Sequence, residues 1–362
     1  MRIDLIQPNE LGPSEIAAWH SMQEATPALA NPFLSPEFTL AAGRLRQGSR
    51  LAVLTDGSCL AGFFPFERRR LGVGVPISGW LSACQGLVHA PGVEWDAREL
   101  LRGCDLAVWK FDNLISEQKP FMPYHVRTAP SPILDLSSGF DQYYTALRSK
   151  RPHLCRELER KTRKLGREAG KLQVVADSRD PRVLRTLMTW KSEQYRRTAH
   201  VDRFQQPWVC ELLESMLETR TKEILGLLSV LYAGDQPVAA QFGLRNHRQL
   251  VGWFTGYDIR YAKYSPGLIH LMLMARELAS ASIQTIHMGK GALKYTQSLR
   301  NGDVPVSEGM VAARSTQGIA HDSWGRASRV TLNTVRQHPA LHSALHMLLR
   351  QGGVTNRVYG RI

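Results

Sequence analysis

The chain has 362 residues, of which 43% are hydrophobic and 22% charged, and its formal net charge is +14. This is a globular composition with a core that needs no disulfide or metal, and the length exceeds that of a usual single domain, so two domains are expected. The five cysteines form no Cys-x-x-Cys pair, which excludes a disulfide framework and a zinc-finger pattern and favours a reducing cytoplasm. We expect no signal peptide and no membrane span, because no long apolar run is present.

The first region, residues 1–130, begins with helices and continues with a hairpin. Ser35 can cap a helix whose first position is Pro36. Residues 51–66 alternate as two strands around Asp56-Gly57, which is a typical hairpin turn. Leu106–Phe111 predicts a buried strand.

Four prolines between residues 120 and 132 predict a boundary between two regions of the chain, so the second region is residues 131–362. Its strands and helices predict an α/β (α+β) protein. The expected strands are 133–136, 172–175, 225–232, 238–244 and 250–255, and the expected helices are 148–171, 182–197 and 208–219.

The predicted helix from Arg148 to Lys171 carries much of the positive charge. Such a helix attracts the phosphates of RNA, anionic lipid or a nucleotide cofactor. The alternative is a solvated helix face, and we favour it because no aromatic residues are interleaved for base stacking. Nucleic acid is therefore not an expected partner.

A loop with Ser265-Pro266-Gly267 opens an apolar helix, and the next expected strand ends in Gly289-Lys290-Gly291. Ser265 can cap this helix, Pro266 suits its first position, and Gly267 leaves the backbone open to a ligand. Unpaired N–H groups and the helix dipole attract anions, so the order of elements is one that can hold the pyrophosphate of an acyl-CoA. The alternative is an ordinary strand-to-helix turn. The predicted cofactor-binding residues are Ser265, Pro266, Gly267, Leu268, Gly289 and Gly291.

Several blocks of the chain form a distinctive set. One is Trp190–Thr198, followed by Asp202-Arg203-Phe204 and Pro207-Trp208, and the others are Asn31–Phe38, Gly62–Phe66 and Leu81–Gly86. Together they resemble blocks of bacterial GNAT acetyltransferases of the CelD/BcsL type (BioF-like acetyltransferases), which are linked to cellulose and exopolysaccharide synthesis. This group is distantly similar to the Fem peptidyltransferases, which carry two tandem GNAT folds.

The resemblance implies two tandem GNAT-like domains, each with a mixed, largely antiparallel central sheet flanked by helices. The first, residues 1–130, would shape the acceptor cleft, and the second, residues 131–362, would bind acetyl-CoA or another acyl-CoA. The implied reaction is acyl transfer to an amine, such as an amino sugar. The implied partner is the machinery of polysaccharide synthesis. One alternative is a Fem-like transferase that uses aminoacyl-tRNA, and another is a non-catalytic scaffold.

The last family motif departs from the pattern in this chain. His287 replaces an Asp, Ala292 and Leu293 replace an acidic pair, and Thr296 replaces a Lys. Ala83-Cys84 likewise replaces an Asp-Tyr pair in the first region. These changes indicate either altered substrate choice or a chain that binds without catalysing.

Acyl transfer needs a base for the amine and an acid for the leaving thiolate. Tyr295, which survives from the motif, is the predicted acid, and His287 is the predicted base. The alternatives are a core tyrosine and a structural histidine. No metal is expected, because the stacked histidines have no carboxylate nearby. These histidines are His338, His342 and His346.

The predicted acceptor-binding residues come from three places. One helix face carries three of them at the spacing i, i+3 and i+4. The alternative for that face is an ordinary amphipathic helix. The full set is Lys191, Gln194 and Tyr195 on the helix, Asp202 and Arg203 in the loop after it, and Gln85 in the first region.

Overall fold

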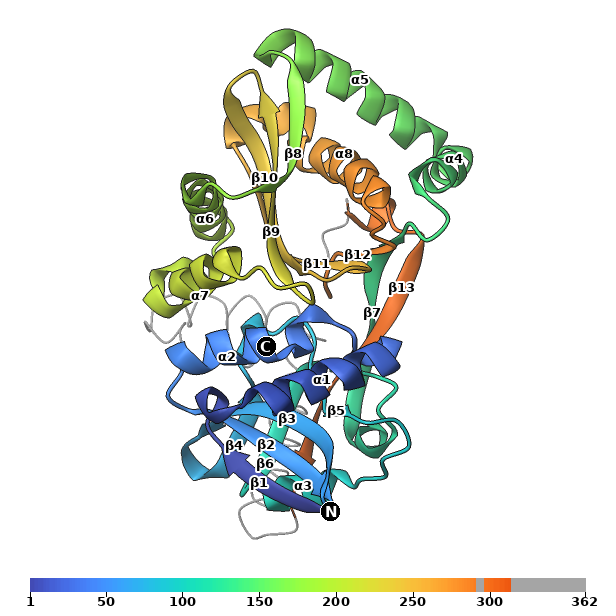
Figure 1. The fold of residues 1–362 in the computed structure, drawn as a ribbon. Helices are drawn as coiled ribbons and strands as arrows, with labels where there is room; N and C mark the ends of the chain where they lie inside the picture. The colour runs from blue at the N-terminus through green and yellow to red at the C-terminus, as the bar shows by residue number, and fades with distance from the viewer. Residues whose placement is uncertain (291–295, 314–362) are drawn as a thin grey trace, which may run out of the picture.

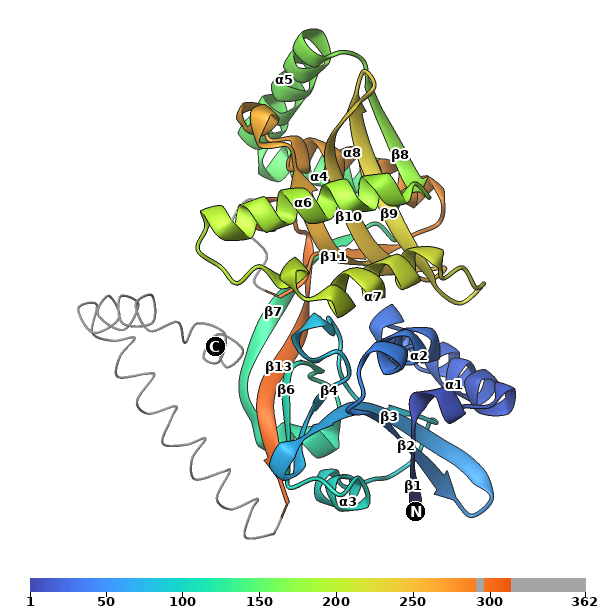
Figure 2. The ribbon, with the colours of Figure 1, turned by 90° about the vertical axis from the view of Figure 1, so that its left-hand side faces the viewer.

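The computed structural model describes residues 1–290 and 296–313, which form two lobes stacked end to end (Figure 1). Two long strands, β7 and β13, run between the lobes (Figure 2). Seven residues named above lie outside the described ranges: Gly291, Ala292, Leu293, Tyr295, His338, His342 and His346. Within the described ranges, no helix is both long and apolar enough to cross a membrane.

The first lobe contains a largely antiparallel sheet covered on both faces. Its strands are β1 (Arg2–Ile6), β2 (Ser49–Asp56), β3 (Cys59–Arg69), β4 (Val73–Pro76), β5 (Val88–His89) and β6 (Val108–Ile115). Helices α1 (Pro13–Ala25) and α2 (Pro36–Leu45) contact β2, β3 and β5, whereas α3 (Ala97–Gly103) contacts β1. The predicted cap is confirmed, because the Ser35 side chain accepts a hydrogen bond from Phe38 N at 3.2 Å. The predicted hairpin is also confirmed, with Gly57 at a φ of 59° in its turn.

The second lobe repeats this layering. Its strands are β8 (Leu172–Ser178), β9 (Leu225–Ala233), β10 (Gln236–Arg245), β11 (Gln249–Tyr257) and β12 (Thr285–His287). Helices α6 (Pro181–Arg197) and α7 (Pro207–Glu218) cover one face. The other face carries α4 (Phe140–Lys150), α5 (Pro152–Ala169) and α8 (Pro266–Ser280) (Figure 1).

The basic segment is two helices, so the single predicted helix is wrong. α4 ends at Lys150 and α5 begins at Pro152. Proline cannot donate a helical hydrogen bond and disfavours a helical conformation in the residue before it. Arg151 accordingly leaves the helical region, with φ −138° and ψ 60°.

Two strands join the sheets of the lobes into one. β13 (Gly302–Ala312) pairs with β6 on one edge and with β7 (His125–Asp135) on the other. β7 in turn pairs with β12. The strand order is therefore β1-β2-β3-β4-β6-β13-β7-β12-β11-β10-β9-β8. The predicted mixed, largely antiparallel fold class is confirmed, and the predicted boundary at residue 130, which stays a prediction, falls within β7.

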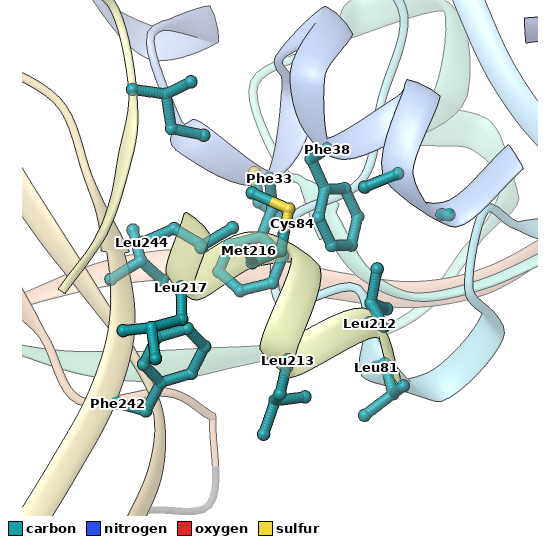
Figure 3. Close-up of a cluster of buried hydrophobic side chains, with 14 of the residues drawn as sticks. Phe33, Phe38, Leu81, Cys84, Leu212, Leu213, Met216, Leu217, Phe242 and Leu244 are labelled. Carbon is teal, nitrogen blue, oxygen red and sulfur yellow. The ribbon is translucent and has the colours of Figure 1, made fainter. Parts of the chain in front are cut away.

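One apolar cluster continues from the first lobe into the second (Figure 3). Phe33 and Phe38 come from the first lobe, and α7 contributes Leu213 and Met216. All four side chains are fully buried. An apolar contact of this kind holds two lobes as one rigid unit, unlike the more polar contacts between mobile domains.

Candidate active site

The candidate site is centred on the point where strands β11 and β12 separate. They pair in parallel at only three positions, which end at Val251 and His287. β11 continues from Gly252 to Tyr257 without a partner on this edge among the described residues. Gly252 permits the close approach where the strands part, since a Cβ there would lie 3.2 Å from the His287 carbonyl oxygen. The free edge offers backbone donors and acceptors to an extended ligand.

The start of α8 lies at the end of β11, and Ser265 does not cap it as the sequence predicted. Ser265 has a left-handed φ of 58°, and its side chain makes no hydrogen bond to the helix. The hydroxyl instead accepts a hydrogen bond from Lys161 Nζ of α5 at 3.0 Å. The backbone oxygen of Ser265 accepts the N–H groups of Leu268 and Ile269.

The first turn of α8 retains an available donor. Pro266 occupies the first position, as predicted, and Gly267 N–H has no hydrogen-bond partner among the described residues. A Cβ on Gly267 would approach nothing closer than Tyr257 Cδ1, at 3.9 Å. Unpaired N–H groups and the helix dipole attract anions, and Lys161 adds positive charge here. This turn is therefore suited to a phosphate group.

His287 ends β12 and pairs with Val251 of β11 and Ile133 of β7. Burial lowers the pKa of its imidazole to about 4. The ring is then neutral at physiological pH, but it is too weak a base to deprotonate an alkylammonium ion. If His287 is the base, turnover should therefore fall only at acidic pH. The unperturbed pKa of histidine would instead place this fall near neutrality.

A second group of side chains gathers where the lobes meet, and we call it the interface cluster. It combines aromatic and charged residues from α6, from β6 and from the 3-10 helices η5 (Gly79–Leu81) and η7 (Arg203–Gln205). Its members are Trp80, Asp112, Lys191, Tyr195 and Arg203.

Arg203 is the centre of the interface cluster. Its guanidinium carbon lies 3.7 Å from the ring centre of Trp80. Burial lowers the pKa of Arg203, and the neighbouring Tyr195 and Asp112 oppose this shift. Burial, and then the charge of Arg203, lower the pKa of Lys191 to about 8. The cluster therefore concentrates positive charge in a desolvated position.

The segment after β12 reaches the interface cluster. Gly289 has a φ of 84°, which favours glycine, and a Cβ there would meet no atom of residues 1–290 and 296–313 within 4 Å. Lys290 Nζ donates a hydrogen bond to the backbone oxygen of Asp112. The start of the altered motif thus lies between the diverging strands and the cluster.

The other predicted acceptor-binding residues are engaged within the protein. The Gln85 amide donates to Asp112 Oδ1 at 2.5 Å and accepts from the backbone N–H groups of Asp112 and Asn113. Asp202 Oδ1 accepts from Ser192 Oγ and from the first turn of η7. Gln194 accepts from Lys191 Nζ at 3.0 Å. Gln85 and Asp202 hold the backbone that presents Asp112 and Arg203, so their direct contact with an acceptor stays a prediction.

Four residues at the site were not identified from the sequence: Trp80, Asp112, Lys161 and Lys290. Lys161 belongs to the basic segment, whose charge is the only signal that pointed to it. Trp80 and Asp112 become neighbours of Arg203 through packing between lobes, which no spacing in the sequence encodes.

Comparisons with known proteins agree with this geometry. Residues 152–297 match the family described as acetyltransferase (GNAT) domain. These residues, less than half of the chain, are similar to a GNAT acetyltransferase domain. No curated protein matches the sequence significantly.

Solved structures extend the likeness beyond the GNAT domain to both lobes. The crystal structure of FemX is 9% identical, with a TM-score of 0.54 over 85% of this chain and 96% of that one. A tandem GNAT protein from the clavulanic acid biosynthesis pathway is also 9% identical, with a TM-score of 0.50 over 87% of this chain and all of that one. At such identities these likenesses show the fold alone.

Proposed function

We propose that the protein transfers an acyl group from acetyl-CoA or a longer acyl-CoA to an amine. The observation that carries this proposal is the free first turn of α8 at the end of the unpaired edge of β11. The turn would hold the pyrophosphate through Gly267 N–H and Lys161, and the edge would pair with the amides of the pantetheine arm.

The acceptor would lie against the interface cluster. Its neutral nitrogen attacks the thioester carbon, the C–S bond breaks, and the thiolate leaves as free CoA. We assign protonation of that thiolate to Tyr295, and removal of the nitrogen proton after attack to His287. The acceptor class that the CelD/BcsL resemblance favours is an amino sugar used in cytoplasmic assembly of an exopolysaccharide. Non-catalytic binding remains the outcome to exclude.

The α8 turn is tested by acyl-CoA binding. Acetyl-CoA should raise the melting temperature, because a ligand that binds only the native state stabilises it by mass action. Gly267→Asp places a carboxylate beside the phosphates and should abolish this shift. Ser58→Asp, exposed in the β2–β3 turn of the first lobe, is the control and should keep it. An unchanged shift in Gly267→Asp would contradict the assignment.

A second candidate, transfer from aminoacyl-tRNA, is favoured by one observation. The basic helix α5 contacts the start of α8 through Lys161, so RNA phosphates could use the same turn. Several phosphate contacts make binding fall steeply with salt. We expect total tRNA to bind only at low salt, whereas retention at physiological salt would favour this candidate over acyl-CoA.

A further inference from the structure

A pocket of about 80 Å³ lies between the lobes and includes no residue of the proposed acyl-transfer site. It is lined by α1 and the α1–α2 connection of the first lobe and, from the second lobe, by the α7–β9 connection and the β10–β11 turn. The volume is sufficient for an ion and a few water molecules. The sequence analysis noted Ser35 of this lining as a helix cap, and Pro32 and Ser35 as part of the block Asn31–Phe38, but assigned no ligand to any lining residue.

Three metal-ligating side chains from three separate segments converge at this pocket; two of them line it, and the third, Glu37, contacts the lining residue His20. They are His20 of α1, Glu37 of α2 and Glu223 of the α7–β9 connection, and their ligand atoms all lie within 4.8 Å of one another. His20 Nε2 and Glu37 Oε1 are 3.0 Å apart. Ligands at about 2.1 Å from a tetrahedral zinc ion are roughly 3.4 Å apart, so small side-chain rotations suffice to form a site.

The second oxygen of Glu37 supplies an independent sign of a missing partner. Glu37 Oε2 is buried and has no hydrogen-bond partner among the described residues, although Oε1 contacts both His20 and Thr221. A buried carboxylate oxygen without a donor is costly, and a cation is one way to satisfy it. The side chain as a whole is only 14% exposed.

The donor set selects the class of ion. An imidazole with two carboxylates suits zinc and related first-row divalent metals, whereas magnesium and calcium prefer oxygen ligands alone. The competing cation, Lys222, is 87% exposed and lies 3.4 Å from Glu223. An exposed pair of this kind contributes little, so it does not prevent metal binding.

We propose that His20, Glu37 and Glu223 bind one Zn²⁺ ion, with water completing the coordination. The ion links α1 and α2 of the first lobe to the α7–β9 connection of the second. Its role is to fasten the lobes at the edge of their apolar contact, because two of its ligands come from one lobe and the third comes from the other. The sequence predicted no metal, since these residues share no ligand spacing.

The test uses the full chain, freed of metal by a chelator and titrated with ZnCl₂ by calorimetry. We expect one equivalent to bind and to raise the melting temperature. Glu223→Gln, on a surface connection, should weaken Zn²⁺ binding by roughly tenfold or more, and Glu37→Gln should do the same. Glu211→Gln is the matched control, because Glu211 is exposed on α7 and belongs neither to the triad nor to the pocket lining, so its loss should leave affinity unchanged.

Two outcomes would overturn the proposal. One is failure of the folded wild type to take up Zn²⁺. The other is binding by Glu223→Gln and Glu37→Gln with the affinity of the wild type, which would place the ion elsewhere. Substitution with Co²⁺ adds a spectroscopic readout, since a tetrahedral site gives intense visible absorption that an octahedral aquo ion lacks.

Discussion

The pKa values of His287 and Lys191 both bear on how an amine becomes nucleophilic. An amine attacks a thioester only in its neutral form. His287, with a pKa of about 4, cannot take a proton from an ammonium ion. Under the proposed function, positive charge from Lys191 and Arg203 would lower the pKa of an amine bound beside them, so the acceptor would be deprotonated before attack. After attack the nitrogen is far more acidic, and a weak base such as His287 suffices.

Removing the charge of Lys191 should therefore move the pH dependence of turnover. In Lys191→Met, the bound amine regains a higher pKa, and the acidic limb of kcat should move up by about one pH unit, or ~1.4 kcal/mol. Lys191→Arg keeps the charge and should keep the limb. In the wild type this influence is lost as pH rises through about 8, where Lys191 itself deprotonates. Release of CoA across a pH series measures the limb, and an unmoved limb in Lys191→Met would contradict this role.

At the scale of elements, the contact between α5 and α8 gives the basic segment a specific use. Only part of its charge reaches the ligand-binding turn. Lys161 is 21% exposed and bonds Ser265, whereas Arg163 is exposed on the same helix. The charge of α5 is thus divided between a solvated face and Lys161, which also pairs with Glu157 at 2.9 Å and which, we propose, contacts the bound anion.

This division predicts different effects for two neighbouring substitutions. Lys161→Met should weaken acyl-CoA binding by roughly tenfold, since a charge-assisted hydrogen bond to phosphate contributes about 1.5–3 kcal/mol. Arg163→Met should change the affinity little and serves as the control. Calorimetry with acetyl-CoA at two salt concentrations measures both. Equal losses of acyl-CoA affinity in the two variants would contradict a specific contact by Lys161 and would indicate that the overall positive charge of α5 attracts the ligand.

Local patterns in the sequence predicted local structure well. The hairpin at residues 51–66 and the β9–β11 meander follow from alternation and turn residues, and Pro266 correctly marked the start of α8. The left-handed backbone conformation of Ser265 was not predicted. The φ angle of a serine depends on the packing of the chain around it, which the local sequence does not show. The return of β13 to the first lobe was missed as well, because pairing between distant strands leaves no periodic signal. For the same reason the interface cluster could be predicted only in part.

At the scale of the whole molecule, the lobes share both their sheet and their core. β13 lies between β6 and β7, so the last described strand completes the first lobe. The apolar cluster of Figure 3 crosses the same junction. Neither lobe can unfold without exposing apolar surface of the other. The interface cluster depends on this junction, because Trp80 and Asp112 come from one lobe and Arg203 from the other.

A substitution inside the junction should therefore destabilise the entire described structure in one step. Leu213 of α7 is fully buried in the shared cluster, and Leu213→Ala should lower the free energy of unfolding by about 2–5 kcal/mol. Leu71→Ala is the control, because Leu71 is 72% exposed and its loss should change stability little. Calorimetry should show one cooperative transition that moves as a whole in Leu213→Ala. Two resolved transitions, of which only one moves, would show that the lobes unfold independently and that the shared core does not couple them.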